Sequence, residues 1–210
     1  MQPEHTEHSE HIIDLRQGQA AMFGYGSLLL QSNMELTLGR PCSQMPVACG
    51  ITGWRRSWDV IMPNRSFYEL SNGAEFIPQN IVYLNVRPSN RDVANGLLYI
   101  LEPEQLEAFD RREWIYNRHE ITQALSGVTV VGGHAYVYVA KPEWRLVPGR
   151  TRKWAAVRGS YLKVIDEGLK ELGPEFRAQY ENSTDPVPTH LVFTDRKRKG
   201  THPLLADAAS

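Results

Sequence analysis

The order of the expected secondary-structure elements restricts the fold of this chain more than any other feature of the sequence. Segments rich in β-branched and aromatic residues, such as "NIVYLNVRPS" and "GVTVVGGHAYVYVA", fill much of the chain before residue 141. The amphipathic segment "PEQLEAFDRRE" interrupts them, and the strongest helical pattern comes later. Because helices do not alternate regularly with strands, the order disfavours a doubly wound parallel sheet. We predict an α+β fold with a mixed, mainly antiparallel β-barrel and helices packed outside.

Local signals predict the individual elements. Residues 33–39 are expected to form a brief helix. "CGITGWRRSWDVIM" predicts two strand pieces separated by a glycine bend, and the dipeptide Asn95-Gly96 predicts a turn that introduces the strand "NGLLYIL". From Trp154 onward the pattern is helical, with a further helix over residues 174–182. "HLVF" is expected to form the last strand.

Length and composition predict one globular domain with short tails. At 210 residues the chain can bury a sizeable core, and no internal repeat or low-complexity linker divides it. We expect an N-terminal arm over residues 1–18, a single domain over 19–195 and a tail over 196–210. No apolar run reaches the roughly 20 residues of a membrane helix, and the polar N-terminus is unlike a signal peptide. Cys42 and Cys49 make no disulfide scaffold, so we expect a cytoplasmic protein.

The charge and histidine patterns predict no nucleic-acid, membrane or metal partner. A formal net charge of −1 offers no broad field for a polyanion. The basic run Arg196-Lys197-Arg198-Lys199 is interpreted as a solvated tail. His5, His8 and His11 recur every third residue, but nothing apolar around them would hold a metal-binding geometry. His119-Glu120 lacks a second histidine four residues on, so we expect no metal and no cofactor.

A glycine-rich stretch, "FGYGSLLL" at residues 23–30, follows the first predicted strand. Ser27 lacks the flanking glycines of a nucleophile elbow, and the stretch lacks the third glycine of a dinucleotide loop. Its backbone N–H groups would lie outside any strand ladder, and the glycines allow a ligand close to the main chain. The residues alone leave two interpretations open: a structural turn, or a binding loop for a carboxylate or developing oxyanion.

Glu113 is the second candidate for chemistry. It ends the predicted helix beside Trp114 and Ile115, so its carboxylate would be partly desolvated. Desolvation raises a carboxyl pKa, which suits a general base working near neutral pH. The alternative is an exposed ion pair between Glu113 and Arg112 or Arg111.

Four stretches together resemble the γ-glutamylcyclotransferase family, with its ChaC-like and AIG2-like members. They are "FGYGSLLL", "ITGWRRSWDV", "VANGLLYILEPEQLEAFDRRE" and "YLKVIDEGLKELG", and they stand in the family's order over roughly residues 20–180. The resemblance implies the γ-glutamylcyclotransferase-like fold, with Glu113 as the catalytic acid/base. It implies that the substrate-binding residues are Tyr25, Gly26, Ser27, Leu28, Tyr116 and Tyr161. Trp114 stands where family members often have glycine.

The reaction that the resemblance implies is an intramolecular cyclisation. The α-amine of a γ-glutamyl group attacks its own γ-carbonyl, which closes 5-oxoproline and releases the attached amine without a cofactor. The expected partner is therefore a small-molecule γ-glutamyl substrate. Two alternatives stay open: a catalytically inactive γ-glutamyl-binding or scaffold protein of the same fold, and a cyclotransferase for γ-glutamylamines or a γ-glutamylated carrier.

Overall fold

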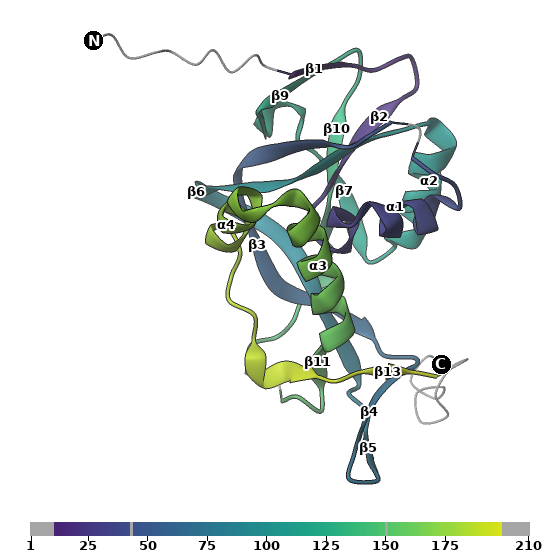
Figure 1. The fold of residues 1–210 in the computed structure, drawn as a ribbon, viewed down its shortest axis with the longest axis vertical. Helices are drawn as coiled ribbons and strands as arrows, with labels where there is room; N and C mark the ends of the chain where they lie inside the picture. Colours follow the sequence, from purple (N-terminus) through teal and green to yellow (C-terminus); the bar gives the residue numbers. More distant parts are fainter. Residues whose placement is uncertain (1–10, 43, 150, 199–210) are drawn as a thin grey trace.

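A strongly curled mixed sheet, in the form of a half-barrel, is the centre of the computed structural model, which describes residues 11–42, 44–149 and 151–198 (Figure 1). Its hydrogen-bonded order is β12 (Val192–Phe193), β11 (Ala155–Arg158), β6 (Asn80–Leu101), β2 (Ala20–Gly24), β10 (Ala135–Ala140) and β7 (Tyr116–Glu120). β3 (Val47–Pro63) pairs with β6 and with β8 (Leu125–Ser126). Most of the ladder is antiparallel, whereas β10 on β2, β11 on β6 and β12 on β11 are parallel. The expected α+β fold is confirmed.

Helices and short 3-10 turns cover the sheet. The α-helices are α1 (Gln31–Leu38), α2 (Pro103–Arg112), α3 (Gly159–Leu172) and α4 (Pro174–Asn182). The 3-10 turns are η1 (Ser27–Leu29), η2 (Thr122–Ala124), η3 (Pro142–Trp144) and η4 (Thr189–Leu191). The helical stripe of α3 buries Tyr161, Ile165 and Leu169. α2 begins with Pro103 in its first turn and a capping box at Glu102, as its sequence favours.

Two small sheets lie at opposite ends of the molecule in Figure 1. One pairs β1 (His11–Asp14) with β9 (Val128–Val131), and the other joins β13 (Arg196–Lys197), β4 (Phe67–Ser71) and β5 (Ala74–Phe76). The expected arm 1–18 and tail 196–210 therefore each contain a paired strand, because backbone partners outside the local sequence hold them. His5, His8 and Lys199 lie outside the described residues. The described chain holds no helix long and apolar enough to cross a membrane.

The two central strands are longer than predicted, because each expected break is absorbed into the ladder. Gly53 has a φ of 84° and marks a shift of register within β3, so the glycine bend exists but leaves one strand. Asn95-Gly96 lies inside β6 opposite Gly50 and Cys49, so the predicted turn is wrong. A Cβ on Gly96 would lie 2.4 Å from the Phe23 ring, so glycine is needed there for close packing rather than for a turn.

The helix predicted from Trp154 is wrong over its first residues. Residues 155–158 form β11, which lies between β6 and β12, and the helix starts only at Gly159. Buried pairing on both edges outweighs local helix propensity in such a short apolar segment. The helix over residues 174–182 is confirmed as α4, and the brief helix at 33–39 is confirmed as α1 with an earlier start, at Gln31.

Candidate active site

The sheet topology brings the glycine-rich stretch and Glu113 to the same edge. β2 and β10 are parallel, so both end at this edge, and β7 is antiparallel to β10, so it begins there. The stretch leaves the end of β2 at Gly24, and Glu113 stands between the end of α2 and the start of β7 at Tyr116. Residues almost ninety positions apart in the sequence thereby face one another.

The loop after β2 turns its carbonyl groups toward the protein. The Gly26 carbonyl accepts from Leu29 N–H at 3.0 Å, and the Ser27 carbonyl accepts from the Asn33 side chain at 3.1 Å. The Leu28 carbonyl accepts from the Tyr99 hydroxyl at 2.6 Å. Within the described chain, the N–H groups of Gly26, Ser27 and Leu28 donate to no turn, cap or side chain. The loop therefore has the donors that an oxyanion or carboxylate would require.

Helix α3 packs directly on this loop. A Cβ on Gly168 would lie 2.8 Å from the Leu29 carbonyl carbon, so only glycine permits the approach. Earlier in the loop, a Cβ on Gly26 would lie 2.8 Å from the Tyr161 hydroxyl oxygen. Glycine at these two positions sets the distance between the loop and the hydroxyl of Tyr161.

Tyr25 is a structural support of the loop as well as part of its surface. Its buried hydroxyl donates to the Tyr138 carbonyl at 2.8 Å, and its own carbonyl accepts from the Tyr180 hydroxyl at 3.2 Å. Burial raises the pKa of Tyr25 well above its usual value and that of Tyr180 to about 12. Both phenols therefore stay protonated near neutral pH and act as hydrogen-bond donors.

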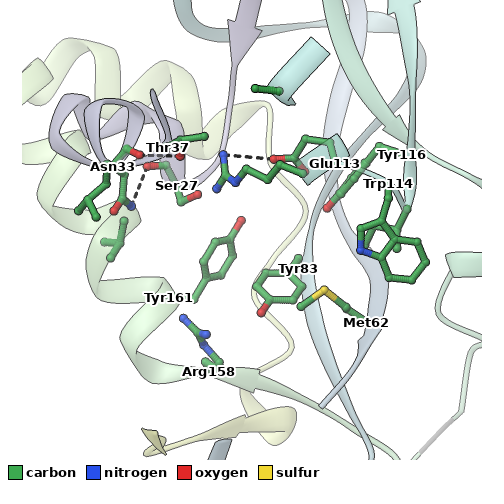
Figure 2. Close-up of a pocket in the computed structure, with 15 residues that line it drawn as sticks. Ser27, Asn33, Thr37, Met62, Tyr83, Glu113, Trp114, Tyr116, Arg158 and Tyr161 are labelled. Carbon is green, nitrogen blue, oxygen red and sulfur yellow. Dashed lines mark hydrogen bonds and ion pairs between the residues drawn. The ribbon is translucent and has the colours of Figure 1, made fainter. Parts of the chain in front are cut away.

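Glu113 combines the two environments that the sequence left as alternatives. Its side chain is 19% exposed, and its Oε1 lies 3.2 Å from Nη1 of Arg112, an ion pair drawn in Figure 2. Burial raises the pKa of the Glu113 carboxyl, and the positive charge of Arg112 lowers it by a smaller amount. The result is a carboxyl group whose pKa is raised above its usual value, the direction of shift that favours a general acid/base.

A small cavity of about 70 Å³ lies between the loop and Glu113. Its lining includes every residue named as a site residue from the sequence, namely Tyr25, Gly26, Ser27, Leu28, Glu113, Tyr116 and Tyr161. The structure thus brings all of them together, while their chemical roles stay predictions. Leu84 and Tyr138 also line the cavity, and nothing in the sequence distinguished them from ordinary strand residues.

A wider cavity of about 710 Å³ lies beside the small one and shares Ser27, Glu113, Tyr116 and Tyr161 with it. Figure 2 shows these side chains around one open space, with Tyr83 and Arg158 below them and Trp114 to one side. Burial raises the pKa of Tyr116 well above its usual value, and its hydroxyl donates to the Leu84 carbonyl at 3.3 Å. Across the residues that the structure describes, no group of three or more histidine, cysteine or acidic side chains is placed to hold a metal ion.

Comparison with solved structures identifies the fold. A structure of a γ-glutamyl cyclotransferase matches with a TM-score of 0.53 at 13% identity, over 90% of this chain and 97% of that one. The chain has the fold of that enzyme. An uncharacterized protein from Homo sapiens matches with a TM-score of 0.52 at 15% identity, over 91% of this chain and 98% of that one. YkqA from Bacillus subtilis matches with a TM-score of 0.54 at 15% identity, over 79% of this chain and 54% of YkqA. No family model and no curated protein matches the sequence.

Proposed function

We propose that this protein is a γ-glutamylcyclotransferase that releases 5-oxoproline from a γ-glutamyl conjugate. The observation that carries the proposal is the small cavity in which a partly buried carboxyl group with a raised pKa, Glu113, faces the donor-rich loop at residues 25–28. The fold shared with a γ-glutamyl cyclotransferase supports the same assignment.

The proposed reaction needs one proton carrier and no water. Glu113 takes a proton from the α-ammonium group, and the free amine attacks the γ-carbonyl carbon. The new C–N bond closes the five-membered ring, and the old amide C–N bond breaks as the leaving nitrogen takes up the proton from Glu113. The ring nitrogen loses its second proton on closure, and this proton passes through Glu113 to the released amine, which leaves as an ammonium ion. General acid–base catalysis of this kind contributes about 10²–10⁴-fold to the rate.

The loop and the tyrosines would hold the substrate in the folded conformation that ring closure requires. The N–H groups of Gly26, Ser27 and Leu28 would bind the α-carboxylate or the tetrahedral oxyanion, and Tyr116 and Tyr161 would line the space around the ring. Positioning the amine at about 3–3.5 Å from the carbonyl carbon is itself a large part of such catalysis.

The substitution Glu113→Gln tests the proposal. It keeps the shape of the side chain but removes the base, so 5-oxoproline release should fall by about 10²–10⁴-fold. Glu107→Gln is the matched control, because Glu107 lies on the same helix with its side chain 74% exposed. Near-wild-type turnover in Glu113→Gln would rule out Glu113 as the base. Binding of γ-glutamyl conjugates without any turnover by the wild type would instead identify an inactive binding protein.

A further inference from the structure

The wider cavity contains a cation that the proposed ring closure does not use. Arg158 ends β11 directly before α3, and its side chain is 18% exposed at the cavity wall. Figure 2 shows Arg158 beneath Tyr161 and Tyr83, on the side of the cavity away from Trp114. An arginine in this position faces the space beyond the γ-glutamyl site, where the leaving half of a conjugate would lie.

The Arg158 guanidinium is held in place without hydrogen bonds to the described residues. It stacks on the Phe67 ring, 3.9 Å from the ring centroid, and its Nε is buried without an acceptor. The carboxylate of Asp195 lies 3.6 Å from Nε, which is beyond hydrogen-bond distance. Asp195 accepts instead from Ser160 at the start of α3, at 2.8 Å from the backbone N–H and 2.6 Å from the hydroxyl.

Two other arginines stack on the same part of the protein and also have a buried Nε without an acceptor, but both differ from Arg158 in that an Nη atom donates to a carboxylate. Arg152 stacks on Phe76 and donates to Glu69 at 2.7 Å, and Arg198 stacks on Tyr68 and donates to Glu75. Their charges are thus satisfied by carboxylates of the hairpin strands. At Arg158 the carboxylate of Asp195 forms an ion pair at 3.6 Å but accepts its hydrogen bonds from Ser160, so the guanidinium N–H groups can still donate to an external bidentate anion.

The opposite wall of the cavity is apolar. Met62, Trp114 and Ile115 line it, and Trp114 is 45% exposed and packs edge-on against Trp144 with ring centroids 4.8 Å apart. The cavity volume of about 710 Å³ accommodates a group the size of an amino acid beside the γ-glutamyl part. An apolar wall that faces a cation suits a ligand with an apolar side chain and an anionic end.

We propose that Arg158 binds a carboxylate on the leaving half of the substrate, while the apolar side chain of that half contacts Met62 and Trp114. This inference rests on the proposed cyclotransferase function. It assigns Arg158 as a specificity-determining residue and the preferred substrate as a γ-glutamyl conjugate of an apolar amino acid. A γ-glutamylamine of the same shape is the poorer substrate, because it leaves the guanidinium without a partner.

Two conjugates that differ only in the carboxylate test the proposal: γ-glutamylphenylalanine and γ-glutamylphenethylamine. The wild type should prefer the first in kcat/KM by about ten- to hundredfold, the usual range for a charged hydrogen-bonded pair. Arg158→Gln should lose this preference, because kcat/KM should fall much further for the phenylalanine conjugate than for the amine conjugate. Arg152→Gln is the matched control, since it removes a stacked arginine outside the cavity and should keep the wild-type preference. Arg112→Gln acts through Glu113, so it should change kcat/KM for the two conjugates by the same factor.

Product inhibition of the wild type gives a second measurement that needs no variant. Phenylalanine should inhibit more strongly than phenethylamine, and equal inhibition would overturn the role of Arg158. Equal kcat/KM values for the two conjugates, in the wild type and in Arg158→Gln, would also overturn the role of Arg158. The release of 5-oxoproline in that experiment would still support the proposed function. Absence of 5-oxoproline from every γ-glutamyl conjugate would overturn the function and this inference together.

Discussion

The contact between Gly26 and Tyr161 gives the sharpest test of how the site is built. A Cβ on residue 26 would lie 2.8 Å from the Tyr161 hydroxyl oxygen, against 3.4 Å for an ordinary contact. Tyr161 cannot easily retreat, because Gly168 on the same helix already lies against the backbone of Leu29. We therefore expect Gly26→Ala to lower the free energy of unfolding by about 1–3 kcal/mol, the usual cost of overpacking.

Removal of the hydroxyl should relieve this cost. In Tyr161→Phe the nearest ring atom would be Cζ, 3.9 Å from the new Cβ, which is an ordinary contact. In a double-mutant cycle measured by urea denaturation, the double variant should therefore be less destabilised than the sum of the two single variants, by an amount close to the cost of the contact. If Gly26→Ala lowers the free energy of unfolding in the wild type and in Tyr161→Phe alike, the shared part of that cost comes from the backbone at residue 26 and not from the Tyr161 hydroxyl. Strictly additive free energies would refute the view that glycine is needed here to make room for Tyr161.

Three further predictions follow from the same geometry. In Arg112→Gln the Glu113 carboxyl loses the charge that lowers its pKa, so the acid limb of the kcat/KM–pH profile should move to higher pH; an unmoved or lowered limb would contradict the assignment of that limb to Glu113. The pKa of Glu113 is raised in the folded state, so ionisation of this carboxyl lowers the stability as the pH rises through that pKa. Glu113→Gln should therefore unfold at a higher temperature than the wild type at neutral pH, and the difference should disappear in acid. Tyr180→Phe loses the 3.2 Å bond to the Tyr25 carbonyl and should lower the free energy of unfolding by about 0.5–1.5 kcal/mol, together with kcat; an unchanged kcat would show that this bond does not hold the loop.

Elements with strong local signals could be predicted from the sequence. The helix that starts at Pro103 begins and ends with the residues that helix termini favour, and the stripe of α3 has the spacing of a buried face. The start of α3 could not be predicted, since residues 155–158 pair with strands that come from distant parts of the chain. The Asn95-Gly96 dipeptide failed for the same reason: its turn propensity is weaker than continuous pairing with β3.

Arg56 shows how far such distant contacts reach. It lies fully buried, donates to Asn95 and Ser183, and stacks over Tyr180 at 3.7 Å from the ring centroid. Tyr180 in turn holds the carbonyl of Tyr25. No local pattern in "ITGWRRSWDV" indicates that one of two adjacent arginines is buried and the other pairs with Asp185.

The sequence by itself determined the chemistry that is available: a glycine-rich stretch with unpaired amides, and a carboxylate beside apolar residues at a helix end. These properties depend on residue type and on neighbours along the chain, so they can be recognised without coordinates. Only the tertiary structure decided that the two face each other across one cavity, because the parallel pairing of β2 with β10 and the antiparallel pairing of β7 set which strand ends meet. It also decided that the Arg158 guanidinium has an ion-pair partner but no hydrogen-bond acceptor among the described residues, since the nearby Asp195 lies 3.6 Å from Nε and accepts from the start of α3.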